Sequence, residues 1–220
     1  MPAASRSNVA LRADAARNRQ TIIDSARRLY CLGGLDTPLD EIARTAGVGN
    51  ATVYRHFPTR CLLVAAAFAD TLRRVLDAVD RALANPDPWA GFAEHVRFLC
   101  RMQADDRGLA DLLTTAIAGA PELEQLRRRA YRAFVRLAER ARSAGALRAD
   151  FTPEDIVLLL MANAGVVHRT ADTAPNAWQR FIDLALDGLR AEAATPAAGS
   201  PCAAAVRRAM RQRGDEFGLG

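Results

Sequence analysis

The chain has 220 residues, of which half are hydrophobic, and its formal net charge is +5. That is enough apolar material for the core of one large domain, or of a small domain joined to a larger one. Alanine and leucine outnumber the β-branched and aromatic residues that favour strands, which argues against an extensive sheet. We therefore predict an all-α protein.

The positive charge is concentrated near the N-terminus. All 30 basic residues are arginines, as a GC-rich genome would encode, and residues 1–60 hold nine of them against five acidic residues. The remaining chain is nearly neutral. Because the guanidinium fork matches phosphate and guanine, this distribution is consistent with a polyanionic partner for the N-terminal part.

The first predicted unit covers residues 14–60 and follows a basic segment, residues 1–13, which we expect to be a flexible arm. Apolar residues then recur with helical spacing until a pair of glycines ends the first helix. Thr37 is placed to cap a second helix that runs to about residue 46. A third, very short helix is predicted over residues 50–56.

The second predicted unit, residues 61–192, is a set of helices entered through a long helix that starts at about Arg60. The Asn-Pro-Asp-Pro stretch at 85–88 ends this helix, and three later helices each begin at a proline. The expected helices are about 60–83, 88–104, 107–118, 121–143, 153–168 and 175–192. Residues 193–220 are expected to be a flexible tail with at most one or two helical turns.

Residues 37–60 carry the clearest functional pattern. They read as a helix, a tight glycine-containing turn and a second helix too short to be stable alone. Val53 and Phe57 are placed to pack this short helix against its neighbours. Its remaining side chains are polar, and such a helix fits the major groove of DNA. The exposed set is Asn50, Thr52, Tyr54, Arg55 and His56.

This stretch resembles the DNA-binding domain of tetracycline-repressor (TetR) family transcriptional regulators. The residues that match the family signature, with its spacing, are Leu39 to Ala43, Gly47-Val48, Thr52-Val53-Tyr54, His56-Phe57 and Arg60. The resemblance implies an N-terminal three-helix helix-turn-helix domain, joined by a long helix to a C-terminal helical domain for ligand binding and dimerisation. The rest of the chain matches the family only in length and helical pattern.

The resemblance also implies roles for single residues. Tyr54, His56 and Arg60 are expected to contact phosphates, with Arg60 standing where the family commonly has lysine. Thr37 is a further phosphate candidate, since helix starts bind anions. Asn50, Thr52 and Arg55 are the candidates for reading bases, Arg55 through guanine and Asn50 through adenine. Arg44 is either another DNA contact or an ordinary solvated side chain.

Family resemblance places the dimer face on the last two predicted helices of residues 61–192, and a small-molecule pocket within the same region. A dimer would present two half-sites about 34–36 Å apart. The dimer candidates are Ile156, Leu160, Asn163, Val167, Trp178, Phe181, Ile182 and Leu189. The pocket candidates are Trp89, Phe92, His95, Phe98, Met102, Phe134, Met161 and His168. For both sets, ordinary core packing is the alternative.

We therefore expect a ligand-responsive regulator: a repressor that binds a palindromic operator as a homodimer and is released by a small molecule. The alternative is a helix-turn-helix regulator without such a ligand, either constitutive or sensing redox state through Cys61 or Cys100. No catalytic, metal-binding or cofactor motif appears, so we expect neither an enzyme nor a cofactor. Residues 1–8 lack the apolar centre of a signal peptide, and apolar runs are too short to cross a bilayer. A cytoplasmic protein without membrane contact is expected.

Overall fold

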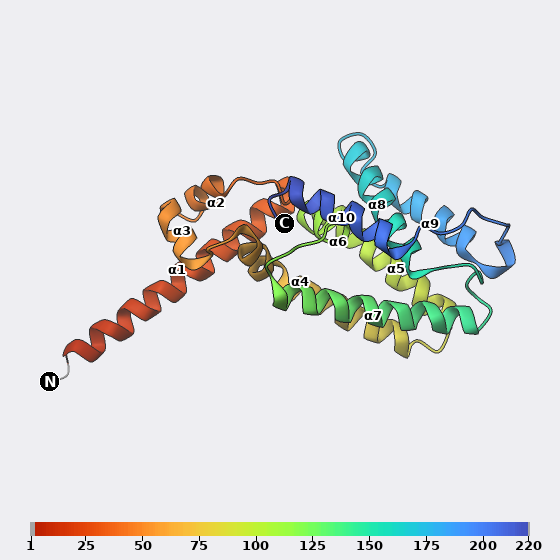
Figure 1. The fold of residues 1–220 in the computed structure, drawn as a ribbon, viewed down its shortest axis with the longest axis horizontal. Coiled ribbons are helices and arrows are strands. Elements are labelled where there is room, and N and C mark those ends of the chain that lie inside the picture. The colour runs from red at the N-terminus through yellow and green to blue at the C-terminus, as the bar shows by residue number, and fades with distance from the viewer. Residues whose placement is uncertain (1–2, 220) are drawn as a thin grey trace.

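The computed structural model describes residues 3–219, which form ten α-helices and a single 3-10 turn, with no strand among them. The predicted all-α fold is confirmed. Figure 1 shows a small N-terminal unit, α1 to α3, connected through α4 to a larger body. The helices are α1 (Ala3–Gly33), α2 (Leu39–Thr45), α3 (Asn50–His56), α4 (Arg60–Ala84), α5 (Pro88–Asp105), α6 (Arg107–Thr114), α7 (Pro121–Ser143), α8 (Pro153–Thr170), α9 (Ala177–Leu189), the 3-10 turn (Ala191–Ala193) and α10 (Ala203–Glu216).

The small unit is held together by buried side chains from all three of its helices. Ile22 and Ala26 of α1, Ile42 of α2 and Val53 of α3 are all buried in one continuous core. The turn between α2 and α3 depends on Gly47, whose φ of +67° is a conformation that side chains with a Cβ rarely adopt. The amide of the following residue returns to α2, so the two helices are fixed at a sharp angle.

The body is built around α4, α5 and α7, with α8 and α9 on the other side of α5. Its core is aromatic where α5 and α7 meet: Phe92 lies 6.0 Å from Phe134 and 5.6 Å from Phe151, measured between ring centroids. The carbonyl of Asn85, in the turn before α5, accepts a hydrogen bond from Arg140 of α7. This bond closes the end of the body remote from α1–α3.

Besides α4, helix α6 joins the two units. Its N-cap residue, Asp106, forms an ion pair with Arg27 of α1 and is itself buried. Asp111, one helical turn further on, accepts the backbone N–H of Leu35 at 2.9 Å. Gly108 faces α1 so closely that an added Cβ would lie 2.8 Å from the Tyr30 carbonyl oxygen. Any movement of α6 must therefore move α1 or break these contacts.

Both chain ends differ from the sequence-based expectation. Residues 3–13, expected as part of a flexible arm, continue α1 as helix, because no proline or glycine interrupts its start. The expected flexible tail instead holds the 14-residue helix α10, whose Val206 is buried, as are Phe217 and Leu219 beyond it. Apolar residues late in the segment supply the packing that its Ala- and Pro-rich beginning does not suggest.

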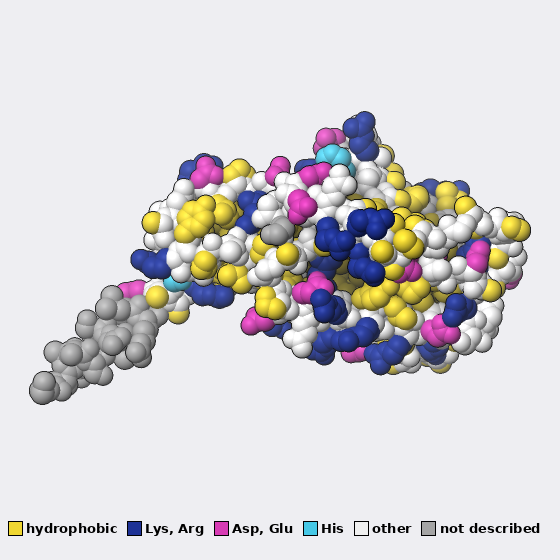
Figure 2. Space-filling view, viewed as in Figure 1, with side chains coloured by type: hydrophobic (Ala, Val, Ile, Leu, Met, Phe, Trp, Pro, Cys, Tyr) yellow, Lys and Arg dark blue, Asp and Glu magenta, His cyan; other side chains and the backbone are white. Residues whose placement is uncertain are grey.

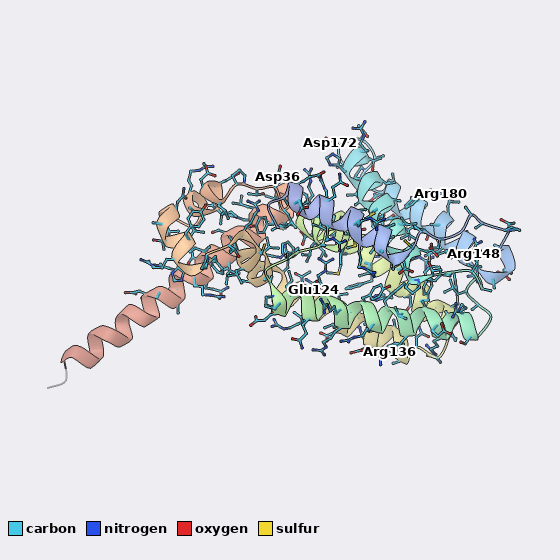
Figure 3. The ribbon with its side chains drawn as sticks, viewed as in Figure 1. Asp36, Glu124, Arg136, Arg148, Asp172 and Arg180 are labelled. Atoms are coloured by element: carbon cyan, nitrogen blue, oxygen red, sulfur yellow. The ribbon has the colours of Figure 1, made fainter. Side chains whose placement is uncertain are left out.

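Residues 190–202 connect α9 to α10 and carry the chain back across the body. Arg148 donates hydrogen bonds to the carbonyls of Gly188 and Thr195, and it also pairs with Asp150 (Figure 3). Ser200 bonds to Thr152 at the start of α8. From there α10 runs towards α1, as Figure 1 shows, and the carbonyl of Leu219 bonds to the segment that follows α6.

Helix α6 is shorter than predicted, ending at Thr114 instead of about residue 118. The segment that follows is irregular, and its amides bond to α10 and to the residues after it: Ala116 donates to the carbonyl of Met210, and Ala118 donates to the carbonyl of Leu219. Within residues 3–219, none of the helices combines the length and apolar character that crossing a membrane would need.

Candidate DNA-reading face and ligand cavity

Helix α3 presents a polar face because two of its apolar side chains are buried beneath it. Val53 is 1% exposed, and Phe57, just after the helix, is buried too. On the opposite side Asn50 and Arg55 are exposed, and Tyr54 is 52% exposed. Of the predicted reading residues, Thr52 and His56 are only partly exposed. This face is polar, unobstructed and carried on a rigid support, as contact with a groove of DNA requires.

Two predicted phosphate contacts point inward in this structure. Thr37 is buried, and its hydroxyl donates to the carbonyl of Gly34 at 2.9 Å, so it does not cap α2, whose N-cap is Pro38. Arg60 donates from Nη2 to the carbonyls of Leu35 and Thr37. Arg60 thus fixes the loop between α1 and α2, a role that the motif alone does not indicate.

The remaining basic residues of the small unit differ in their surroundings. Arg44 is exposed and lies 3.9 Å from Glu41, a surface pair of little energetic weight. Arg19 lies over the Phe57 ring, 5.0 Å from its centroid, and Arg17 pairs with Asp14. The side chain of Arg12 falls outside the residues whose side chains are described.

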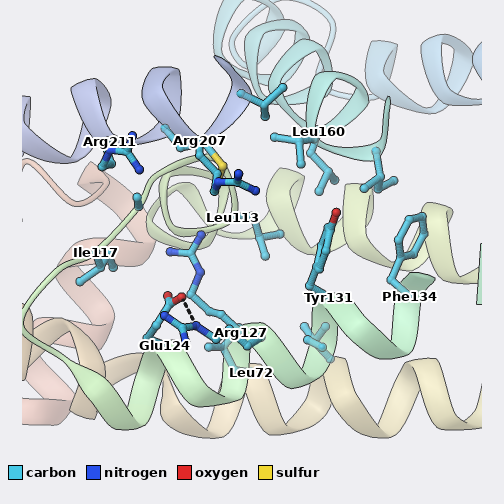
Figure 4. Close-up of a pocket in the computed structure, with 18 of the residues that line it drawn as sticks. Leu72, Leu113, Ile117, Glu124, Arg127, Tyr131, Phe134, Leu160, Arg207 and Arg211 are labelled. Atoms are coloured by element: carbon cyan, nitrogen blue, oxygen red, sulfur yellow. Dashed lines mark hydrogen bonds and ion pairs between the residues drawn. The ribbon is translucent and has the colours of Figure 1, made fainter. Parts of the chain in front are cut away.

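A cavity of about 1010 Å³ lies in the body, between α7 and α10. Helices α4, α5 and α8 complete its walls, together with the segment that follows α6 (Figure 4). Of the predicted pocket residues, His95 and Phe134 line it. Ile156 and Leu160, predicted for the dimer interface, line it as well, because α8 turns this side towards α7. The volume lies at the upper end for a small-molecule site.

The other six predicted pocket residues lie elsewhere. Phe92 and Met102 are buried in the core, and Trp89, Phe98 and Met161 are partly buried. Their helical spacing therefore reflects packing, the alternative that the pattern left open. His168 is exposed, and its Nδ1 lies 3.2 Å from Nη2 of Arg107.

His95 is the polar group at the inner end of the cavity. It is 3% exposed and lies against the Phe98 and Phe134 rings, at 6.3 and 6.2 Å between centroids. Among the described residues its Nδ1 has no hydrogen-bond partner. Burial lowers the pKa of His95 to about 4, so the imidazole is uncharged at neutral pH.

Sequence reasoning missed the arginines that line the cavity, because it treated residues 193–220 as a tail. Arg207 and Arg211 reach the cavity from α10, and Arg127 reaches it from α7. Burial lowers the pKa of Arg127 from its ordinary value, and Glu124 partly offsets this effect. The available signal was the apolar pair Val206 and Met210, four residues apart as on one face of a helix.

The side chains of most of the predicted dimer residues point towards the interior of the protein. Asn163 is fully buried and donates to the side-chain oxygen of Gln103 at 2.9 Å, while Trp178 and Ile182 belong to the core. Val167, Phe181 and Leu189 are partly buried. Instead, Leu158 of α8 and Leu184 of α9 are the large apolar side chains exposed on these helices, by 43% and 54%.

The two thiols considered as redox sensors are poorly suited to that role. Cys100 is buried in the core, and burial raises its pKa to about 12. Burial also raises the pKa of Cys61. Because the thiolate is the reactive form, neither side chain has the environment of a sensing cysteine.

Comparison with known proteins agrees with this geometry. The model of the tetR family of bacterial regulatory proteins matches residues 22–67, and that of the SbtR-like transcriptional regulator C-terminal domain matches residues 87–191. No curated protein matches the chain.

Among solved structures, a TetR transcription regulatory protein from Mycobacterium vanbaalenii is 35% identical, with 82% of this chain and 99% of that chain covered and a TM-score of 0.48. A TetR regulator from Streptomyces coelicolor is 32% identical over 78% of this chain and 98% of that one, with a TM-score of 0.49. RolR, in complex with its ligand resorcinol, is 23% identical over 90% of this chain and 95% of that one, with a TM-score of 0.54.

Proposed function

The chain belongs to the TetR family of transcriptional regulators, and we propose that it is a repressor that binds a palindromic operator as a homodimer. A small molecule bound in the cavity of the body releases it from DNA. The observation that carries this proposal is the polar face of α3, set on a buried apolar support in the most basic part of the chain. RolR, which holds resorcinol, supports the ligand-dependent part by its similar fold.

The reading residues divide into two groups. Asn50, Thr52 and Arg55 lie towards base edges and supply sequence preference, with Arg55 paired to a guanine. Tyr54 and His56 bind phosphates on either side and set the register. A third group acts from outside α3: Arg44 and Arg60 contribute positive charge near the backbone, and the buried Thr37 acts by holding Arg60.

Communication between cavity and DNA runs through α6. The segment after α6 lines the cavity, and the helix itself is bound to α1 by the Arg27–Asp106 ion pair and to the loop after α1 by the bond from Leu35 to Asp111. A ligand that binds more tightly to one arrangement of α6 shifts α1, and with α1 the position of α3. In a dimer this shift changes the separation of the two reading helices.

The dimer is formed by the outer faces of α8 and α9. Leu158 and Leu184 are large apolar side chains left exposed on a single chain, and Phe181 is partly covered beside them. A second copy would bury them, as in other two-fold helical interfaces. One reading helix alone makes too few contacts for tight binding, so the dimer is also required by the proposed DNA contact.

The test is selection of bound genomic fragments, followed by anisotropy titrations of the selected operator with purified variants. Tyr54→Phe should weaken binding to every sequence, since a phosphate contact carries no sequence information, while Arg55→Ala should flatten the ranking of operator variants. Arg136→Ala, on the outer side of α7, is the matched control (Figure 3). Selection without enrichment of a common motif, or an unchanged ranking with Arg55→Ala, would contradict the assignment.

A further inference from the structure

We infer that the cavity between α7 and α10 takes an amphipathic anion, with an apolar body and one carboxylate or phosphate-ester head group. This ligand class deepens the proposed function, on which it rests, by giving the effector a chemistry. Its recognition depends on α10, which lies outside the residues matched by either family model.

The inner part of the cavity is apolar. Leu99 of α5 and Leu160 of α8 line the cavity together with Phe134 of α7, on which the buried His95 packs, and Figure 4 shows Phe134 away from Arg127. Water gains few hydrogen bonds from such walls, so it is favourable for the apolar body of a ligand to replace water in the space between them. The volume of about 1010 Å³ accommodates a molecule much larger than a single aromatic ring.

The outer part of the cavity is basic. Figure 2 shows basic side chains gathered on both sides of a hollow whose floor is hydrophobic. Arg127 comes from α7, and Arg207 and Arg211 face it from α10. Of the acidic side chains that the structure describes, none forms an ion pair with these three arginines. Arg127 is partly buried, whereas Arg207 and Arg211 are exposed, and this surplus of positive charge at one end of the cavity favours an anionic ligand.

Arg127 is the best prepared of these groups. Its Nη1 donates to the carbonyl of Thr115, which fixes the guanidinium at the cavity wall. Its neighbour Arg128 is already neutralised by Glu124 at 2.8 Å. A held guanidinium loses little freedom when it binds an oxyanion through two parallel hydrogen bonds.

The acidic residues of the cavity do not reverse this preference. Glu154 lies next to Tyr131, whose pKa is raised by burial first and by Glu154 second, and Asp215 is exposed on α10. At the inner end the uncharged, buried His95 offers no charge to a head group. The head group therefore lies at the arginine end, and the apolar body points towards His95.

Calorimetric titration of the full-length protein with probes of equal length separates the possible chemistries. Decanoate and decyl phosphate carry the proposed head groups, whereas decan-1-ol and decylamine share the apolar body and lack the negative charge. Both anions should bind at least about ten times more tightly than the alcohol or the amine, the range expected for charge-assisted hydrogen bonds. If only one anion binds, the difference identifies the head group. Equal or tighter binding of decan-1-ol or decylamine, or no binding of either anion, would overturn the inference.

Matched variants locate the head group. Arg127→Met and the double variant Arg207→Met/Arg211→Met should each weaken decanoate binding about tenfold to a hundredfold. Arg136→Met on α7 and Arg208→Met on α10 remove an exposed arginine from the same helices outside the cavity, and should leave it unchanged. Equal losses in both sets would show attraction by net charge alone and refute the site. Circular dichroism melting of each variant distinguishes lost binding from lost folding.

Operator binding is measured separately, so the two proposals can fail independently. A protein that binds an operator but neither anion retains the proposed DNA contact and loses this ligand class. A protein that binds decanoate through Arg127 but no DNA sequence has the ligand site without the proposed function. When both hold, decanoate should lower operator affinity in the wild type and not in Arg127→Met.

Discussion

The buried imidazole of His95 should make the stability of the protein depend on pH in a defined window. Its pKa is lowered by burial to about 4 in the folded chain, against an ordinary value of 6.5. Between these values the unfolded chain binds a proton that the folded chain does not. The free energy of unfolding therefore falls as the pH is lowered below about 6.5, and the loss is complete near pH 4.

The size of the effect follows from the shift. About 2.5 pKa units correspond to roughly 3 kcal/mol when the window has been crossed, and to about 2 kcal/mol at pH 5. Carboxylates also titrate at the lower end of this range, so the wild type alone does not isolate the histidine. His95→Phe removes the imidazole and retains a ring that can pack on Phe98 and Phe134.

Urea unfolding at a fixed protein concentration, at about pH 7.5 and pH 5, gives the comparison. The difference in unfolding free energy between wild type and His95→Phe should change by about 2 kcal/mol between the two pH values, in favour of the variant at pH 5. His168→Phe, which removes an exposed imidazole, is the control for loss of a histidine outside the core. A difference that stays constant for His95→Phe would refute the buried, uncharged state.

Three further changes test the small unit and its contact with the body. Gly47→Ala should cost about 1 kcal/mol, because φ is +67° there, while Gly49→Ala has open space and an ordinary φ and should cost little; equal costs in urea unfolding would contradict this. Gly108→Ala should destabilise by about 1–3 kcal/mol, because its Cβ would lie 2.8 Å from the Tyr30 carbonyl oxygen, and an unchanged urea midpoint would show that α6 can move away from α1. Val53→Ala should lower stability by about 2 kcal/mol and weaken operator binding in anisotropy titrations; intact DNA affinity would show that α3 needs no apolar support.

The local signals in the sequence predict the helices well where glycine and proline punctuate the chain. Helix α3 was expected at its observed bounds, and α7 begins at the proline that marked it. Side-chain roles are harder to predict, because apolar spacing identifies which face of a helix is buried but does not identify the residues that pack on that face. Leu160 is predicted for a dimer face and lines the cavity, and Asn163 is buried with its amide nitrogen bonded to Gln103 on α5. The periodicity of α8 alone could identify neither the cavity that Leu160 lines nor the Gln103 side chain that bonds to Asn163.

The same limit explains why the cavity was only partly anticipated. His95 and Phe134 lie on helices that the pattern identified, but the basic wall requires α10 to return across the body. That return depends on long-range bonds, from Arg148 to the carbonyl of Thr195 and from Ser200 to Thr152, which no local pattern records. A segment that reads as a tail by composition can therefore carry one wall of a candidate binding site.

The position of α10 also gives the proposed anion a route to the reading helix. Its far end is bonded to the segment that follows α6, through the amides of Ala116 and Ala118, and α6 is locked to α1. An anion held between α7 and α10 would relieve the repulsion between Arg127 and Arg207 and draw the two helices together. Gly214 packs so closely on Ala116 that a Cβ would lie 2.2 Å from its carbonyl oxygen, so we expect a displacement of α10 to be passed to the segment that follows α6. We therefore expect the head group, which would bind both α7 and α10, to contribute to the displacement of α3 in the proposed release from DNA.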